Sequence, residues 1–217
     1  PRPVPIAVPP STAKGTSAPS CAPSSCSSRV LSPASSSTFT ARRDAAASAD
    51  PPPMPPATGT ALRQLVVEGD AAQLALARLA LTGLAQPAED VAAADLTGDW
   101  KCSMTKIGGL LPAVGYPPFR CRIAGAAGRL TFDKLTGSQR TRGTLQLADG
   151  RWVYLGSTFV AGEQPMDYAD FPEVVDTSAG ETLPDVGVFE VTGPDSARIL
   201  FPQPYRESIL NVLTLTR

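Results

Sequence analysis

The chain contains no histidine, and its basic and acidic side chains almost balance, at 19 and 20. Histidine is the commonest general base and the commonest metal ligand, so its absence argues against the usual acid–base and metal chemistry. A net charge of −1 provides no basic footprint for nucleic acid. No apolar run approaches the roughly 20 residues that cross a bilayer. The sequence therefore predicts no metal, no cofactor, no nucleic-acid partner and no transmembrane segment.

Candidates for covalent catalysis are equally scarce. A cysteine nucleophile needs a positioned base, and no histidine is present to provide one. Ser138 lies near Lys134 and Arg140, but Thr-Gly-Ser-Gln at 136–139 is ordinary turn material. We therefore predict that the chain is not an enzyme and has no catalytic residues.

The N-terminal segment, residues 1–60, is poor in groups that could form a core. It holds 13 of the 23 prolines, 12 serines and one aromatic residue, Phe39. Such a segment buries too little apolar surface to offset its ordering entropy, so we predict that it is disordered. It has no acidic residue before Asp44 but several arginines, which is typical of an organelle transit peptide. A plain linker is the alternative interpretation.

Residues 61–95 are predicted to form a short helical segment. Good helix formers fill it as far as Leu84, and Gly69 separates two short helices. Asp70 followed three residues later by Gln73 predicts a capping box at the second helix. Three leucines fall near one face, which we expect to pack on the domain that follows, or else to bind a partner. They are Leu74, Leu81 and Leu84.

From Thr97 the hydrophobic period changes to two. Gly98, Trp100, Cys102 and Met104 alternate with polar residues, which indicates a strand with one buried face. Short turns such as Asp149-Gly150 link successive runs into hairpins. We predict a mainly β fold, in which residues 97–217 form a small eight-stranded antiparallel meander barrel after one or two short helices. The seven further runs are 116–124, 128–135, 140–148, 151–160, 186–192, 197–202 and 206–217.

The start of the first strand, Gly98-Asp99-Trp100, resembles the Gly-x-Trp motif of the lipocalin or calycin barrels. In that family the tryptophan closes one end of the barrel, and a basic side chain near the last strand packs across its indole. The resemblance implies Arg217 as that side chain, with Arg206 as the second candidate. The chain differs from lipocalins because its helices precede the barrel and none follows it.

A closer resemblance covers nearly all of 97–217. Several blocks in one order resemble an uncharacterised family of exported bacterial proteins, domain of unknown function 4893. They are Gly98-Asp99-Trp100-Lys101-Cys102, Lys106-Ile107-Gly108-Gly109, Phe119-Arg120-Cys121-Arg122-Ile123, Lys134-Leu135-Thr136-Gly137-Ser138-Gln139-Arg140, Tyr154-Leu155-Gly156 and Pro204-Tyr205-Arg206-Glu207-Ser208. The resemblance implies export and a cysteine pair, and it implies no assigned activity and no catalytic residues.

Two cysteines support export independently. Cys102 and Cys121 fall on the apolar side of their predicted strands, where adjacent antiparallel strands can bring two sulfurs within bridging distance. A persistent disulfide belongs to an oxidising compartment, so we predict a periplasmic or secreted protein. Two buried free thiols are the alternative for the cysteines, and an organelle is the alternative location.

Two functions remain open. The predicted inner side chains are bulky, which favours a filled barrel acting as a structural or protein-interaction domain, with an envelope protein as partner. The alternative is a lipocalin-like container for one small apolar ligand, with the acidic loop 161–185 over its mouth; it needs a cavity of roughly 300 Å³ or more. The candidate closure or ligand-facing residues are Trp100, Met104, Phe119, Phe132, Arg206 and Arg217, and the inner set also includes Ile123 and Leu130.

Overall fold

The computed structural model describes residues 56–126, 129–178 and 180–217. Predictions made for residues 1–55 lie outside the described residues. Helices α1 (Pro56–Glu68), α2 (Ala71–Leu81) and α3 (Ala93–Leu96) precede one antiparallel sheet. Its strands are β1 (Gly98–Ile107), β2 (Ala113–Gly115), β3 (Phe119–Ala126), β4 (Arg129–Lys134), β5 (Gln139–Ala148), β6 (Arg151–Val160), β7 (Leu183–Gly193), β8 (Ser196–Pro202) and β9 (Leu210–Thr216).

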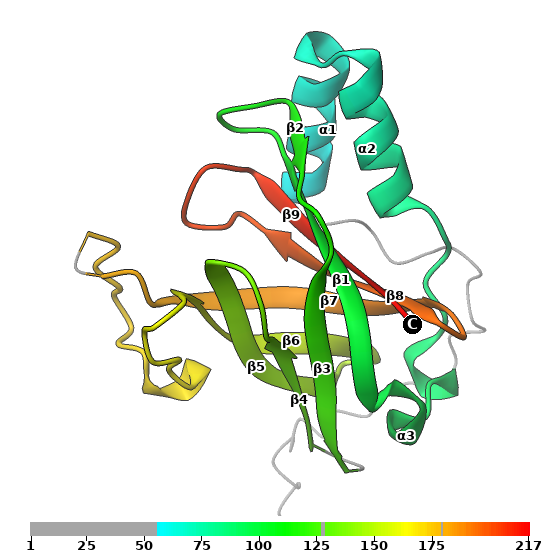
Figure 1. Cartoon of the computed structure of the whole chain (residues 1–217), viewed down its shortest axis with the longest axis vertical. Helices are drawn as coiled ribbons and strands as arrows, with labels where there is room; N and C mark the ends of the chain where they lie inside the picture. The colour runs from blue at the N-terminus through cyan, green and yellow to red at the C-terminus, as the bar shows by residue number, and fades with distance from the viewer. Residues whose placement is uncertain (1–55, 127–128, 179) are drawn as a thin grey trace, which may run out of the picture. The chain divides into compact units, whose positions relative to one another are not determined.

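The sheet closes into a barrel, as predicted (Figure 1). From β3 to β9 each strand pairs with the next, and β1 pairs with both β3 and β9. The closing register runs from Lys101 opposite Thr216 to Ile107 opposite Leu210. Seven pairs in this seam leave eight strands without a long free edge, which removes a template for aggregation. The barrel is therefore an eight-stranded meander, and the fold class is confirmed.

Three strand boundaries differ from the sequence prediction by three residues or more. The segment 116–118 is not part of β3, and three residues before it form the additional strand β2 on the edge of β1. The last strand begins at Leu210, not at 206, because residues 203–209 form a loop in which Gln203 and Glu207 have positive φ values. Strand β7 begins at Leu183, so the loop after β6 is shorter than the predicted 161–185.

Large side chains fill the barrel interior. Phe132, Tyr154 and Phe201 are fully or almost fully buried, and the Tyr154 ring makes edge-to-face contacts with both phenylalanines. The ring centroids are 6.0 Å and 5.4 Å apart, within the range of favourable aromatic pairs. Gly156 makes room for this cluster, since a Cβ there would lie 2.5 Å from the Tyr154 hydroxyl. The centre of the barrel is thus filled with packed side chains.

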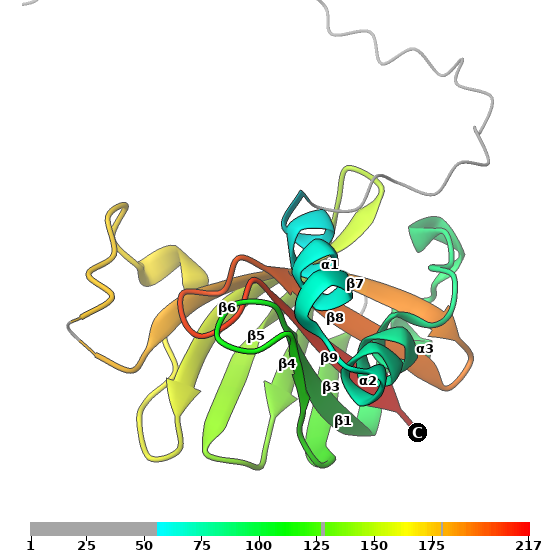
Figure 2. The ribbon, with the colours of Figure 1, turned by 90° about the horizontal axis from the view of Figure 1, so that it is seen from above.

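Helices α1 and α2 lie on the outer face of the sheet, over β9 and the neighbouring parts of β1, β2 and β8 (Figure 2). This cover explains why both faces of β8 and β9 are buried: Phe201 and Leu213 belong to the barrel core, whereas Leu200 and Val212 pack under the helices.

The predicted capping box of α2 is present, because the Asp70 carboxylate accepts from the Gln73 N–H and the Gln73 side chain accepts from the Asp70 N–H.

The predicted packing is wrong for two of the three leucines assigned to one helix face. The buried residues of α2 are Ala77 and Ala80, and Leu81 packs against the core. Leu74 is exposed, and Leu84 lies beyond the end of the helix and is exposed as well. The small side chains of Ala77 and Ala80 let the helix approach the sheet closely, and Leu76 also lies over the sheet, since a Cβ at Gly115 would lie 3.0 Å from its side chain. Periodicity alone does not separate these two faces because both are apolar.

The end of the barrel beside α3 is sealed. The Trp100 indole N–H donates to the Leu96 carbonyl at 2.9 Å, and the Arg217 guanidinium lies 4.2 Å from the indole centroid. Arg217 also donates to the carbonyls of Asp95 and Thr97, at 2.6 Å and 2.9 Å. A single arginine therefore joins the end of β9 to the backbone that leads into β1.

Replacing Arg217 by alanine should lower the free energy of unfolding by about 1 to 2 kcal/mol, since a cation–π contact and two charge-assisted hydrogen bonds are lost near the surface. Tryptophan emission should change as well. Urea titration followed by fluorescence measures both effects, with the exposed helical Arg63→Ala as control. If Arg217→Ala leaves emission and stability unchanged, Arg217 does not seal this end.

The disulfide predicted between Cys102 and Cys121 is present and joins β1 to β3. Both residues are buried in the barrel core, at 1% and 0% exposure, with a Cα–Cα distance of 5.9 Å. That distance lies in the usual range for disulfides. The bridge fixes the strand pair that carries Trp100, and so it stabilises the sealed end.

Candidate functional site

The other end of the barrel is open and forms a cavity. Here β1, β4, β6 and β8 end, while β3, β5, β7 and β9 begin, so side chains from all eight strands surround one space. The cavity volume is about 130 Å³. This is less than half of the roughly 300 Å³ expected of a pocket for a drug-sized ligand. The space lies above the aromatic cluster, with Phe201 in its wall.

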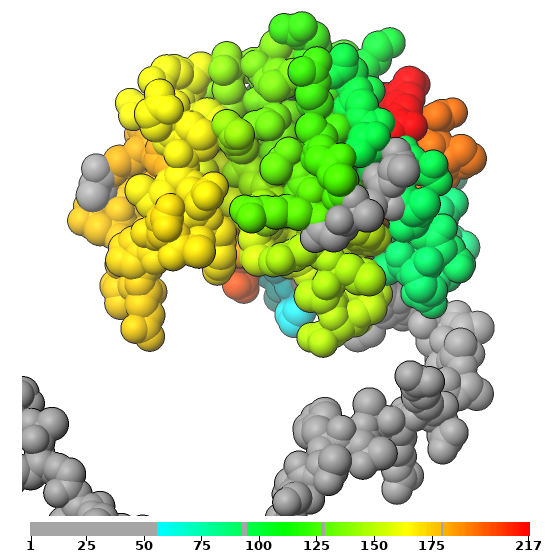
Figure 3. Space-filling model, turned by 90° about the horizontal axis from the view of Figure 1, so that it is seen from below, coloured from blue at the N-terminus to red at the C-terminus, as the bar shows by residue number. Residues whose placement is uncertain are grey.

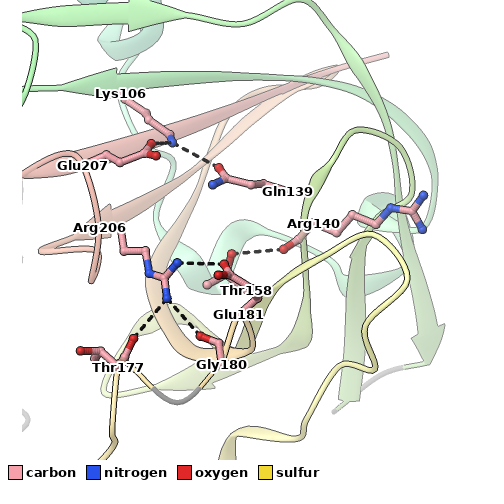
Figure 4. A network of polar contacts seen from close by, with 9 residues as sticks. All are labelled: Lys106, Gln139, Arg140, Thr158, Thr177, Gly180, Glu181, Arg206 and Glu207. Atoms are coloured by element: carbon pink, nitrogen blue, oxygen red, sulfur yellow. Dashed lines mark hydrogen bonds and ion pairs between the residues drawn. The ribbon is translucent and has the colours of Figure 1, made fainter.

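Two buried lysines enter this space. Lys106 of β1 and Lys134 of β4 line the cavity, and their residues are only 8% and 6% exposed. Lys106 forms an ion pair with Glu207 and donates to the Gln139 side chain at 3.2 Å (Figure 4). Lys134 instead donates to the Gln139 carbonyl and lies 3.9 Å from the centroid of the Phe119 ring.

Lys134 is the more unusual of the two cations. Within the described part of the chain, no carboxylate lies within ion-pair distance of its ammonium group. Burial, together with the positive charges of Lys106 and Arg140, lowers the pKa of Lys134 to about 8. A buried ammonium without a counter-ion is costly, so this position favours an anion nearby.

A hydroxyl network lies deeper in the same wall. The Thr141 hydroxyl is 2.6 Å from the Tyr154 hydroxyl and donates to the Ser157 carbonyl at 3.1 Å or to the Asp185 carboxylate at 3.0 Å. One hydroxyl hydrogen cannot serve both acceptors at once. When Asp185 is protonated it can donate to Thr141, which frees the Thr141 hydrogen for the Ser157 carbonyl. The neutral form of Asp185 therefore satisfies more of the network.

The pKa values agree with this arrangement. Burial raises the pKa of Asp185 to about 7, although the hydrogen bond from Thr141 opposes the shift. Burial also raises the pKa of Tyr154 well above its ordinary value, and the Asp185 charge adds to that rise. Tyr154 is consequently a neutral hydroxyl, and Asp185 changes charge near neutral pH.

The loop between β6 and β7 borders the opening. Arg206 pairs with Glu181 at 2.8 Å and donates to the carbonyls of Thr177 and Gly180, at 3.1 Å and 3.0 Å (Figure 4). The Ser157 hydroxyl accepts from the Met166 N–H at 3.0 Å. In the space-filling view this loop projects from the continuous outer surface of the strands (Figure 3). The first part of the loop is thus tied to β6 through Ser157, and the second part is tied to Arg206, which lines the cavity.

The sequence-predicted residues divide between the two ends. Trp100, Arg217, Cys102 and Cys121 lie at the sealed end or in the adjoining core. Arg206 does not reach the indole and instead holds the loop at the opposite end. The other three candidates are Met104 and Phe119, which line the cavity, and Phe132, which is fully buried below it.

The sequence analysis did not place Lys106 and Lys134 in a cavity, although strand parity contains the signal. Lys106 follows Trp100, Cys102 and Met104 at even spacing, so the same inward face ends in a lysine. The same spacing extends the inward positions Leu130 and Phe132 to Lys134. An inward charged position at the end of a strand is therefore the feature that identifies this site.

Ser138 also lines the cavity, beside Lys134. No hydrogen bond joins the two side chains among the residues described, and Cys102 and Cys121 are joined in the predicted disulfide, so the alternative of two free thiols is wrong. The site thus presents cations, hydroxyls and one carboxylate of variable charge around a small space.

The geometry defines a closed antiparallel β-barrel with one sealed end and one polar open end. A family model described as "Domain of unknown function (DUF4893)" matches residues 46–215, so the chain belongs to this family. The match begins well before residue 97 and therefore includes α1 and α2, which the resemblance to residues 97–217 did not cover. No curated protein and no solved structure matches the chain.

The described helices include none that is long and apolar enough to cross a bilayer. The disulfide is compatible with an extracellular or periplasmic location, where thiols are oxidised.

Proposed function

We propose that the chain is an exported, non-catalytic binding domain that holds one small polar molecule at the open end of a filled barrel. The carrying observation is the cavity of about 130 Å³, which buried Lys134 enters without a carboxylate partner in the described structure. The filled centre argues against the lipocalin-like alternative of an apolar ligand inside the barrel, because Tyr154 and Phe132 already occupy that space.

The size of the cavity limits the ligand. A cavity of about 150 Å³ in another protein accommodates benzene, so this one suits a molecule with about half a dozen heavy atoms. Export is part of the proposal because the buried disulfide needs an oxidising compartment to form and persist.

Native mass spectrometry of protein purified from its own cells tests the proposal. The wild-type chain should retain a small molecule that is released on denaturation. Ser138→Phe, at the exposed rim of the cavity, should lose it, whereas Gln146→Phe on the outer face of β5 should retain it. Absence of any bound molecule from the wild-type protein would contradict the proposal.

A protein-interaction domain is the second candidate function, and the exposed apolar side chains around the helices favour it. Five aliphatic residues there are more than two-thirds exposed. Contiguous exposed apolar side chains are typical of surfaces that contact another macromolecule. The five residues are Val66, Val67, Leu79, Leu84 and Leu110. Co-purification of a protein that is lost on replacing Leu79 and Leu110 by serine would favour this function.

A further inference from the structure

We propose that the molecule held in the cavity is a short-chain carboxylic acid, bound as its anion with the carboxylate against the Lys134 ammonium group. This inference rests on the proposed function and specifies its ligand.

The first argument is the balance of charges around the cavity. Lys106 is neutralised by Glu207, and Arg206 is neutralised by Glu181. Arg140 contributes its backbone to the network, and its guanidinium points away from these residues in Figure 4. Among the described lining residues, Lys134 and Arg140 are the cations without an ion pair, and of these two Lys134 is the buried one, while Asp185 is the remaining carboxylate on the lining. Near neutral pH the Asp185 charge is incomplete, so the cavity retains positive charge.

The second argument is the hydrogen-bonding capacity of Lys134. An ammonium group has three donors, and the described structure gives it one acceptor, the Gln139 carbonyl. Its burial leaves little access to bulk water, so the remaining donors need a partner within the cavity. An oxyanion supplies both the missing acceptors and the missing charge, and hydrogen bonds between charged groups are the strong ones.

The third argument distinguishes an organic acid from inorganic phosphate. Apolar side chains line the same space as Lys134, namely Met104, Phe119, Leu183 and Phe201. They offer contact surface to a short alkyl group, and phosphate has no such group. A carboxylate with a short apolar tail therefore matches both parts of the lining, and a long acyl chain is excluded because Phe132 and Tyr154 fill the barrel below.

Isothermal titration calorimetry of the full chain at pH 7 tests this inference with three probes: butyrate, its neutral analogue butyramide, and inorganic phosphate. We expect saturable binding of butyrate, with butyramide and phosphate at least about tenfold weaker, as the loss of a charged hydrogen bond implies. Lys134→Gln should weaken butyrate binding by about 10- to 100-fold, and Lys134→Arg should restore part of it.

The matched control is Lys101→Gln, because Lys101 is exposed on the same strand as Lys106. This variant should bind butyrate with the affinity of the wild type. Circular dichroism of each variant shows that the fold is retained. Equal binding of butyrate and butyramide, or tighter binding of phosphate, would overturn the carboxylate inference while the proposed binding function stands. Failure of all three probes, with no molecule retained in native mass spectrometry, would overturn both.

Discussion

Replacing Cys102 and Cys121 together by alanine should lower the free energy of unfolding by about 3 kcal/mol on the loop-entropy model. The bridge closes a loop with a sequence separation of 19 residues, and its loss gives the unfolded chain more conformations. Both side chains are buried, so the small voids left by the sulfurs add to the loss. Urea titration of the oxidised wild type and of the double variant measures the difference.

Reductant gives the internal control for this prediction. Under reducing conditions the wild type should move toward the double variant, and the double variant should not respond. A double variant as stable as the oxidised wild type would show that the strand pairing of β1 and β3 does not depend on the bridge.

Asp185→Asn should remove a large pH dependence of stability. The pKa of Asp185 is about 7 in the folded chain, against an ordinary value of 3.8. Between these values the folded state holds the proton more tightly than the unfolded state, so the stability of the wild type falls as pH rises from about 4 to 7. A difference of about three pKa units corresponds to roughly 4 kcal/mol for a fully buried group, and somewhat less here because Asp185 is partly exposed.

Unfolding titrations from pH 4 to pH 9 isolate the effect as a difference between curves. The wild type should lose stability relative to Asp185→Asn up to about pH 7, and the difference should then stay constant, because Asp185 is ionised in both states. Asp99→Asn is the matched control, since Asp99 is exposed and pairs with Arg122 on the outer surface. Parallel curves for the wild type and Asp185→Asn would show that the Asp185 carboxylate is not buried in the network with Thr141.

The barrel could be predicted from the sequence because its strands bury one face over most of their length. In β4 the buried residues Leu130 and Phe132 alternate with less buried Thr131 and Asp133, and such alternation fixes the register. The helix packing was not predictable in the same way, because the alanines and leucines of α2 give no clear apolar side. Strand β2 was also missed, since three residues are too few to show a period.

The site was harder to predict than the fold. Lys106, Lys134 and Asp185 lie on three different strands, and only the closure of the barrel brings them around one cavity. The registers of β5, β6 and β7 place Asp185 opposite Gly156, and Gly156 opposite Gly143. These registers determine which strand ends lie together at the open end, and a single sequence does not specify them. Charged residues at inward positions of otherwise apolar strands were the available signal.

The most direct test of a charged cavity at the open end is the pKa of Lys134, measured by NMR from the titration of its side-chain carbon signals with and without butyrate. Without the ligand the pKa should be about 8, well below the ordinary 10.5. Saturating butyrate should raise it, because a bound anion stabilises the charged ammonium. A Lys134 pKa near 10.5 that butyrate leaves unchanged would contradict both the burial of this lysine and its role in binding an anion.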